Sequence, residues 1–308
     1  MKKTGVILFL LLALSWSAAL AGQEVLVVQS MRVKPYESAF AGLKAGFPTR
    51  LHRLVLEESG PEQVLEKIRG IRPDVIVAIG GNALHALKPI HSIPIVYTMV
   101  LNPEQIAAPA GNVRGVSMRI PPQKQLSALL DVLPGISRIG LLYDPAHNGT
   151  FVSEAAAAAE RTGLDLVARE LRHAADAPAM IMDLKGKIDV FWMLPDKTVA
   201  TPATIEFLLL FSLESHVPLF TFSEKYVEVG AFMSMDIDPY DMGLQAGEMA
   251  RSIRSGDAGK HSGQEFARKA VVATNLMIAR KIGLTPSLAS LPGATLETRV
   301  FRQIQIVN

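Results

Sequence analysis

Polar side chains and glycines follow several apolar segments of this 308-residue chain, at the points where predicted strands end. In open α/β sheets, ligands bind beyond the carboxyl ends of the strands. The residues in these positions that can contact a ligand are Ser30, Gly81, Asn82, Thr98, Asn102, Asp196, Phe222, Ser223, Asp236 and Tyr240. Seven such short loops at one end of two sheets predict a cleft that binds a small molecule.

The residue types in these loops suit a zwitterion. Backbone N–H groups around Gly81 and Asn82 lie at a predicted helix start, which favours a ligand carboxylate. Asp196 and Asp236 offer carboxylates to a ligand ammonium group, and Phe222 and Tyr240 can stack on an aromatic ligand. Each residue alone is also explained as a turn former. The coincidence of all the loops favours the binding interpretation.

No pattern in the sequence indicates catalysis, a metal ion or a cofactor. The chain has no cysteine, and none of its seven histidines lies in an H-E-x-x-H pattern. Dinucleotide, P-loop and nucleophile-elbow motifs are absent. We therefore predict no catalytic residue, no metal site and no cofactor. An enzyme on the same scaffold stays open as an alternative, which turnover of the bound compound would reveal.

Strand-like and helix-like segments alternate along the chain, which predicts parallel sheets with helices on both faces. The predicted strands are 25–29, 51–56, 74–79, 94–98, 138–143, 164–169, 188–193, 217–221, 230–235 and 266–273. The predicted helices are 35–46, 61–69, 82–87, 122–133, 151–162, 175–185, 202–215, 240–254 and 276–282. The fold class is α/β, with two similar doubly wound parallel-sheet lobes joined by a hinge. We assign 22–118 with 231–273 to lobe 1, 119–230 with 274–290 to lobe 2, and 291–308 to a tail that adds an edge strand.

Residues 1–21 have the pattern of a secretory signal peptide. Lys2 and Lys3 precede the apolar run 6–14, and Ala19-Leu20-Ala21 forms a cleavage site. An uncleaved membrane anchor is the alternative. Without cysteine there is no lipid anchor, so we predict a protein free in the periplasm. The leader holds two of the 31 basic residues and none of the 29 acidic ones, so the rest has zero net charge. This balance predicts neither a nucleic acid nor an anionic membrane as partner.

Several segments together resemble the ABC-transporter substrate-binding family that includes tryptophan and tyrosine binders. They are RPDVIVAIG (72–80), IPIVYTMVLNP (93–103), GNVRGVS (111–117), LLDVLPGISRIGLLYDP (129–145), IDVFWMLPDKTV (188–199), VPLFTFSE (217–224), GAFMSMDIDPYDMGLQAGEMA (230–250) and NLMIARKIGL (275–284). The resemblance implies a type I periplasmic binding fold with three crossovers between its lobes. It also implies that a solute is captured by hinge closure and that Ser30, Gly81, Asn82, Thr98, Asp196, Phe222, Ser223 and Asp236 line the pocket.

The resemblance further implies a monomeric protein that delivers its solute to an inner-membrane ABC permease. Two loops depart from the family pattern: Leu101-Asn102-Pro103 replaces Thr-Asp-Pro, and Gly80-Gly81 replaces an Ala-Thr pair. We therefore carry over only the ligand class, an amino acid or related zwitterion. The alternative function is sensing, in which the closed form contacts a membrane receptor or kinase.

Overall fold

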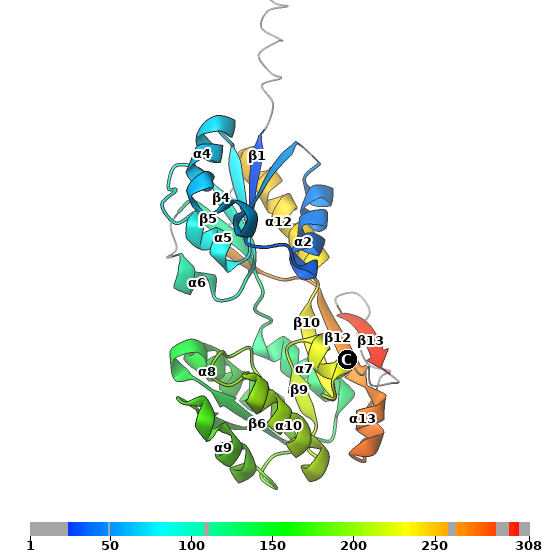
Figure 1. Cartoon of the computed structure of the whole chain (residues 1–308). Coiled ribbons are helices and arrows are strands. Elements are labelled where there is room, and N and C mark those ends of the chain that lie inside the picture. Colours follow the sequence, from blue (N-terminus) through cyan, green and yellow to red (C-terminus); the bar gives the residue numbers. More distant parts are fainter. Residues whose placement is uncertain (1–23, 49, 108–110, 258–262, 288–295, 302–308) are drawn as a thin grey trace, which may run out of the picture. The chain divides into compact units, whose positions relative to one another are not determined.

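The computed structural model of the chain contains two compact units (Figure 1). It describes residues 24–48, 50–107, 111–257, 263–287 and 296–301. The first unit comprises residues up to Arg119 together with Pro239–Ala267, and the second comprises Ile120–Asp238 together with the residues from Arg268 onward. The chain therefore passes between the units at 119–120, 238–239 and 267–268.

The first unit is built on a six-stranded sheet in which every strand pair is parallel. The strand order is β11 (Gln264–Phe266), β5 (Val113–Ser117), β4 (Ile95–Val100), β3 (Val75–Ile79), β1 (Val25–Gln29) and β2 (Leu51–Val55). All six strands thus begin at one edge of the sheet, here called the amino edge, and end at the opposite carboxyl edge. β1, β3 and β4 are buried along their whole length, as expected for a sheet covered on both faces.

Helices cover the two faces of this sheet. Side chains of α4 (Glu62–Ile71) and α5 (Gly81–Ala86) join those of β1 and β3 in one apolar cluster. The opposite face is covered by α2 (Lys34–Gly46) and α12 (Pro239–Arg254), which pack on each other and on the central strands. Two short helices, α3 (Leu56–Ser59) and α6 (Pro103–Ile106), complete the unit.

Four glycines set the distance between α2 and α12. A Cβ placed on Gly243 would lie 1.9 Å from the Ala39 carbonyl oxygen, and one on Gly42 would lie 1.9 Å from the Tyr240 carbonyl oxygen. Gly46 and Gly247 repeat this contact one turn further along the helices. The backbones touch where no side chain fits, so these glycines attach residues 239–254 to the first unit.

The second unit has a seven-stranded sheet, parallel except where β10 pairs with β12. The order is β13 (Leu296–Phe301), β12 (Ala270–Asn275), β10 (Met233–Ile237), β9 (Leu219–Thr221), β8 (Val190–Trp192), β6 (Arg138–Tyr143) and β7 (Asp165–Glu170). Its helices are α7 (Pro122–Val132), α8 (Pro145–Thr162), the 3₁₀ turn Ala174–Asp176, α9 (Ala177–Asp183), α10 (Pro202–Ser215), α11 (Glu224–Glu228) and α13 (Leu276–Lys281).

Apolar side chains fill the second unit on both sides of its sheet. The Trp192 ring lies between Phe151, at 5.6 Å edge to face, and Phe220, stacked at 6.1 Å. Its indole N–H donates to Gln125 Oε1 at 3.2 Å, which satisfies the one polar atom of this buried ring. Trp192 therefore belongs to the core of the second unit, where it is 1% exposed.

The α/β class and the two parallel-dominated sheets match the sequence prediction, but the lobe boundaries differ. Residues 231–273 were expected together in lobe 1, whereas β10 and β12 belong to the second sheet and only Pro239–Ala267 belong to the first unit. The predicted strand 266–273 is two strands, β11 and β12, in different sheets. Arg268 and Lys269 interrupt the apolar run at this crossing, and Lys269 pairs with Asp238 at 2.9 Å.

Two local predictions were wrong in extent. α8 begins at Pro145 and not at 151, because Asp144 caps the helix by accepting the Ala146 N–H at 2.9 Å. β10 continues to Ile237, so Asp236 lies in the strand and not after it. The predicted edge strand in the tail is confirmed at Leu296–Phe301, which pairs with β12. The predicted signal peptide lies outside the described residues, among which no helix is long and apolar enough to cross a bilayer.

Candidate functional site

At the carboxyl edge of the first unit, Ser30 and Tyr36 meet at Gly80. Ser30 is buried, and its Oγ accepts the Ala83 N–H at 2.9 Å, which ties the end of β1 to the first turn of α5. Gly80 has φ of +92°, and a Cβ there would lie 2.6 Å from Ser30 Oγ and 2.7 Å from the Tyr36 ring. Only glycine fits this position.

The sequence analysis missed Tyr36. Its ring is half-buried in the first turn of α2, and burial raises the pKa of its hydroxyl. Ile106 of α6 also approaches this point, with Cδ1 3.3 Å from the Cβ position of Gly81. Asn82 is exposed on α5. An aromatic residue in the first helix after the first strand is the signal that would have identified Tyr36.

The end of β4 contains an irregularity beside these residues. The register between β4 and β5 shifts between Tyr97 and Val100, and Met99 has φ of +56°. Thr98 is fully buried, and its hydroxyl donates to the Met242 carbonyl oxygen of α12 at 3.4 Å. Asn102 follows with φ of +50°, a left-handed conformation that asparagine tolerates. Thr98 therefore binds α12, and Asn102 forms the turn into α6.

In the second unit, Asp196 has a structural role that differs from the predicted one. Its side chain is 1% exposed. Oδ2 accepts the Asp144 N–H at 2.8 Å and the Asn148 amide at 2.7 Å, while Oδ1 accepts the N–H groups of Thr198 at 2.9 Å and Val199 at 3.3 Å. These four bonds use the acceptor positions of a carboxylate. Asp196 joins the loops after β6 and β8, and no acceptor position is left for a ligand ammonium group.

Asp144 completes this joint from the other loop. Its Oδ2 accepts the Thr198 hydroxyl at 2.7 Å and its Oδ1 accepts the Ala146 N–H, and these bonds hold the pKa of Asp144 below its usual value. His147 Nδ1 lies 3.7 Å from Asp144 Oδ2 and has no hydrogen-bond partner. Asp144–Asn148 thus form a helix cap and a first helical turn.

Asp236 and Ser223 lie together at the ends of β10 and β9. The Ser223 side chain hydrogen-bonds to the Asp236 carboxylate, which also accepts the Ile237 N–H at 2.8 Å. Burial raises the pKa of Asp236, and the hydrogen bonds from Ile237, Ser223 and the Glu224 N–H offset only part of this effect. Phe222 packs edge to face on Tyr226 at 5.3 Å. Here the second unit has a half-buried carboxylate that is hydrogen-bonded to Ser223, the residue after Phe222.

Each sheet therefore gathers its own predicted residues at its carboxyl edge. In the first unit, the structure brings Ser30 and Gly80 together with the unpredicted Tyr36. In the second unit it brings Ser223 and Asp236 together, while Asp196 belongs to a separate network. Tyr240, in the first turn of α12, is 43% exposed. No group of three His, Asp or Glu side chains in the described part of the chain is placed to hold a metal ion.

Comparisons with known proteins agree on one family. A family profile described as ABC transporter substrate binding protein matches residues 58–292. A tyrosine-binding protein of Clostridioides difficile is 25% identical over 204 residues, which cover 63% of this chain and 59% of that protein, less than two thirds of its length.

Solved structures with the same fold cover most of this chain. The ligand-free, open form of a Clostridium difficile substrate binding protein with adhesive properties has a TM-score of 0.75 at 19% identity, covering 91% of this chain and 100% of that one. An ABC domain from Streptococcus pneumonia in complex with L-Trp has a TM-score of 0.60 at 21% identity, covering 90% and 100%. A conserved domain protein of Vibrio cholerae has a TM-score of 0.62 at 26% identity, with the same coverage.

Proposed function

Because this chain belongs to the ABC transporter substrate-binding protein family, we propose that it captures an amino acid or related zwitterion with an apolar side chain. The solute would contact the carboxyl edges of both units, and closure of a hinge would bury it. The closed form would deliver it to an ABC permease on the outer side of the inner membrane. The observation that carries this proposal is the partly buried carboxylate of Asp236, whose pKa is raised by burial.

Asp236 suits a ligand ammonium group. A desolvated carboxylate gains most from a cation that approaches it, since burial has already removed part of its hydration. Three donors, the Ser223 hydroxyl and the N–H groups of Ile237 and Glu224, fix the orientation of the carboxylate and leave one of its four acceptor positions for a ligand. Asp196 is not part of the proposed contact surface, because the protein itself uses its acceptors.

The first unit suits the rest of such a ligand. Tyr36 and Ile106 provide apolar surface on either side of Gly80-Gly81, and Phe222 of the second unit provides an aromatic ring. Asn82 is exposed and can donate its amide to a ligand carboxylate. The tyrosine-binding relative supports an aromatic amino acid as the first compound to test.

Thermal-shift titration with the twenty amino acids tests this proposal. A ligand at 100 times its dissociation constant stabilises the folded protein by about 2.7 kcal/mol and raises the melting temperature. We expect a hit among the aromatic or large aliphatic amino acids. Asp236→Asn should weaken that ligand by about tenfold to a hundredfold, because a charge-assisted bond contributes about 1.5–3 kcal/mol.

Two variants provide the controls. Tyr36→Ala removes apolar contact and should weaken the same ligand, whereas Tyr36→Phe keeps the ring and should bind like the native protein. Asp257→Asn alters an exposed carboxylate that follows the last turn of α12, at the amino edge of the first unit, and should change nothing. A well-folded protein that responds to no amino acid, or whose ligand binds Asp236→Asn as tightly as the native chain, would refute the proposal.

The proposed ion pair also predicts a pH dependence. Burial raises the pKa of Asp236 above its ordinary value, so acidification protonates it sooner than an exposed aspartate. A protonated carboxyl cannot pair with an ammonium group, so affinity should fall as the pH decreases toward this raised pKa. The Asp236→Asn variant should lack this dependence, which calorimetric titrations over a pH series would measure.

A further inference from the structure

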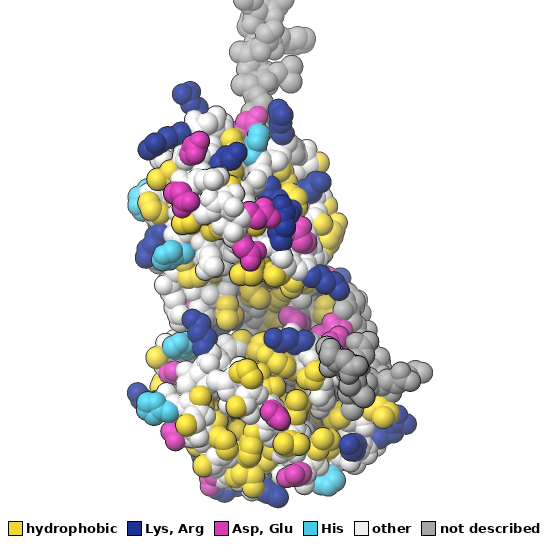
Figure 2. Space-filling model, viewed as in Figure 1, with side chains coloured by type: hydrophobic (Ala, Val, Ile, Leu, Met, Phe, Trp, Pro, Cys, Tyr) yellow, Lys and Arg dark blue, Asp and Glu magenta, His cyan; other side chains and the backbone are white. Residues whose placement is uncertain are grey.

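The amino edge of the first unit carries an excess of positive charge. Three connections that enter its strands and the last turns of three of its helices meet at this edge. Its exposed basic side chains are Lys44, Arg50, Arg69, Arg72, Lys88 and Arg251. None of these six forms an ion pair among the described residues. Figure 2 shows dark-blue side chains around the end of the first unit where β1 begins.

Helix ends explain only part of this charge. Lys44, Arg69 and Arg251 lie in the last turns of α2, α4 and α12, where a cation complements the helix dipole. Arg50 and Lys88 lie in connections, and Arg72 follows α4 with φ of +52°. The acids of this region are fewer: Glu24 pairs with His52, Asp74 and Asp257 lie in connections, and Glu66 and Glu248 precede the last turns of α4 and α12. The edge therefore keeps a net positive charge.

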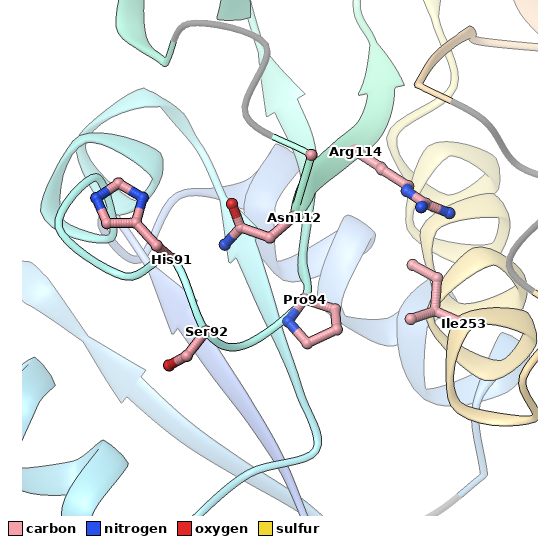
Figure 3. Close-up of a pocket in the computed structure, with 7 residues that line it drawn as sticks. His91, Ser92, Pro94, Asn112, Arg114 and Ile253 are labelled. Atoms are coloured by element: carbon pink, nitrogen blue, oxygen red, sulfur yellow. The ribbon is translucent and has the colours of Figure 1, made fainter.

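A groove opens at this edge between the strand starts and α12. It has a volume of about 700 Å³, and Figure 3 shows His91, Ser92, Asn112 and Arg114 around it. The Asn112 amide donates to the carbonyl oxygens of Ile90 at 2.8 Å and Ile93 at 2.9 Å, which fixes the loop that carries His91 and Ser92. The polar side chains of His91, Ser92, Asn112 and Arg114 line this groove together with the apolar Pro94 and Ile253.

The chain also enters the folded unit at this edge. Asp74 donates its N–H to the Glu24 carbonyl oxygen at 3.0 Å, immediately before β1 and β3 begin side by side. The residues that precede Glu24 contain Lys2 and Lys3 followed by the apolar run 6–14, a segment of the kind that enters membranes. Glu24, the first described residue after this segment, therefore lies at the basic amino edge.

We propose that the amino edge of the first unit is a docking surface for anionic lipid headgroups. Each lysine or arginine near an anionic bilayer contributes about 1 kcal/mol. A nucleic-acid surface would interleave its cations with exposed aromatic rings. At this edge the ring of Phe47 is 1% exposed and lies beneath the guanidinium group of Arg254, so it cannot stack on a base. The zero net charge of the chain after residue 21 does not reveal this basic surface, because most of the acidic residues that balance it lie elsewhere in the fold.

Vesicle co-sedimentation of the full chain tests this inference, with phosphatidylcholine vesicles compared with vesicles that also contain phosphatidylglycerol. We expect the chain to bind the vesicles that contain phosphatidylglycerol more tightly than those of phosphatidylcholine alone. This preference should weaken as salt screens the charges. The double variant R50Q/R72Q should reduce affinity by about thirtyfold, or about fivefold for each charge. The matched control K185Q/K281Q removes two exposed lysines from the second unit and should bind normally.

The chain from Gly22, assayed in parallel, separates the edge from the leader. We expect it to keep the preference for anionic vesicles. Loss of binding on removal of residues 1–21, or equal weakening by the two double variants, would overturn the proposal. Circular dichroism and the melting temperature verify that each variant is folded. Amino-acid binding should be unchanged in R50Q/R72Q, so a failure here is distinguishable from a failure of the proposed function.

Discussion

The two units share a parallel α/β design but stabilise their carboxyl edges in different ways. The first unit uses backbone contacts and small residues: Ser30 makes one bond to Ala83, and Gly80 lets Tyr36 and Ser30 approach. The second unit uses carboxylates: Asp196 makes four bonds that join two loops, and Asp236 is held by Ser223. The difference shows that a similar edge can present apolar surface in one unit and negative charge in the other.

The amino edges of the two units differ in how their charged side chains are paired. In the second unit Arg138 donates to Asp189 at 2.8 Å, and Asp189 also accepts the N–H groups of Ser137 at 2.9 Å and Arg138 at 2.8 Å. At the amino edge of the first unit, six exposed side chains have no such partners in the described part of the chain: Lys44, Arg50, Arg69, Arg72, Lys88 and Arg251. The unpaired cations at the amino edge of the first unit are the basis of the proposed anion-binding surface, and the Arg138–Asp189 pair has no counterpart among those six side chains.

The largest expected effect concerns the helix pair that is peculiar to the first unit. Gly243→Ala would place a methyl group 1.9 Å from the Ala39 carbonyl oxygen, and both groups belong to helix backbones that cannot yield easily. We expect a loss of about 3 kcal/mol or more in the free energy of unfolding, at the upper end of overpacking effects. Urea denaturation followed by circular dichroism measures it.

Gly149→Ala in α8 of the second unit is the matched control. A Cβ at this helical position has no neighbour within 4 Å. The substitution should stabilise the protein by about 0.5–1 kcal/mol, because alanine loses less conformational freedom than glycine in a helix. Equal stability of the two variants would show that the α2–α12 contact does not constrain the first unit.

The next effect concerns the two loop joints. Asp196→Asn would leave buried N–H donors facing an amide NH₂ group, and we expect a loss of about 3 kcal/mol. Ser30→Ala removes one hydrogen bond and should cost about 1 kcal/mol. Guanidinium denaturation of both variants compares the joints, and a smaller loss in Asp196→Asn than in Ser30→Ala would contradict the structural role of Asp196.

A smaller effect is expected for Asp189 in the second unit, whose contribution to the free energy of unfolding should depend on pH. Hydrogen bonds from Arg138 and Ser137 lower the pKa of Asp189 to about 2 in spite of its partial burial. Since this pKa lies below that of the unfolded chain, the stabilisation is present above about pH 4 and is lost as the pH falls toward 2. Asp189→Asn should cost about 1–2 kcal/mol at pH 7 and almost nothing at pH 2. Denaturation at a series of pH values gives the difference.

The smallest effect is expected at Glu37 in the first unit. Its carboxylate pairs with Arg53, and the hydrogen bond from Arg53 lowers the pKa of Glu37. Glu37 is 41% exposed, so solvent screens the pair and Glu37→Gln should cost less than about 1 kcal/mol. A larger loss in Glu37→Gln than in Asp189→Asn would reverse our ranking of the two networks.

Much of the fold could be predicted from local patterns. Continuous apolar runs such as 75–79 identify strands buried on both faces, and the proline and glycine positions around 34–46 identify a helix. The segment 266–273 could not be divided correctly, because hydrophobicity alone does not reveal that two neighbouring strands join different sheets. The start of α8 was missed because Asp144-Pro145 was interpreted as a turn and not as a helix cap.

The candidate site could also be predicted only in part from the sequence. Topology places strand ends at one edge, so Ser30, Ser223 and Asp236 could be selected from sequence with no knowledge of their contacts. Which aspartate remains available to a ligand depends on the four donors around Asp196, which come from the loop after β6 and from Asp196's own loop. Tyr36 acquires its place only through its contact with Gly80, 44 positions away in the chain.

The sequence by itself determined the class of fold, the strand ends and the family, because hydrophobic periodicity and turn residues are local properties of the chain. Only the tertiary structure decided how these parts divide between two units and which carboxylate is already satisfied. It also decided where charge accumulates, since the net charge of a sequence is a sum without positions. Six parallel strands bring separate basic residues to one edge, and that arrangement depends on the fold.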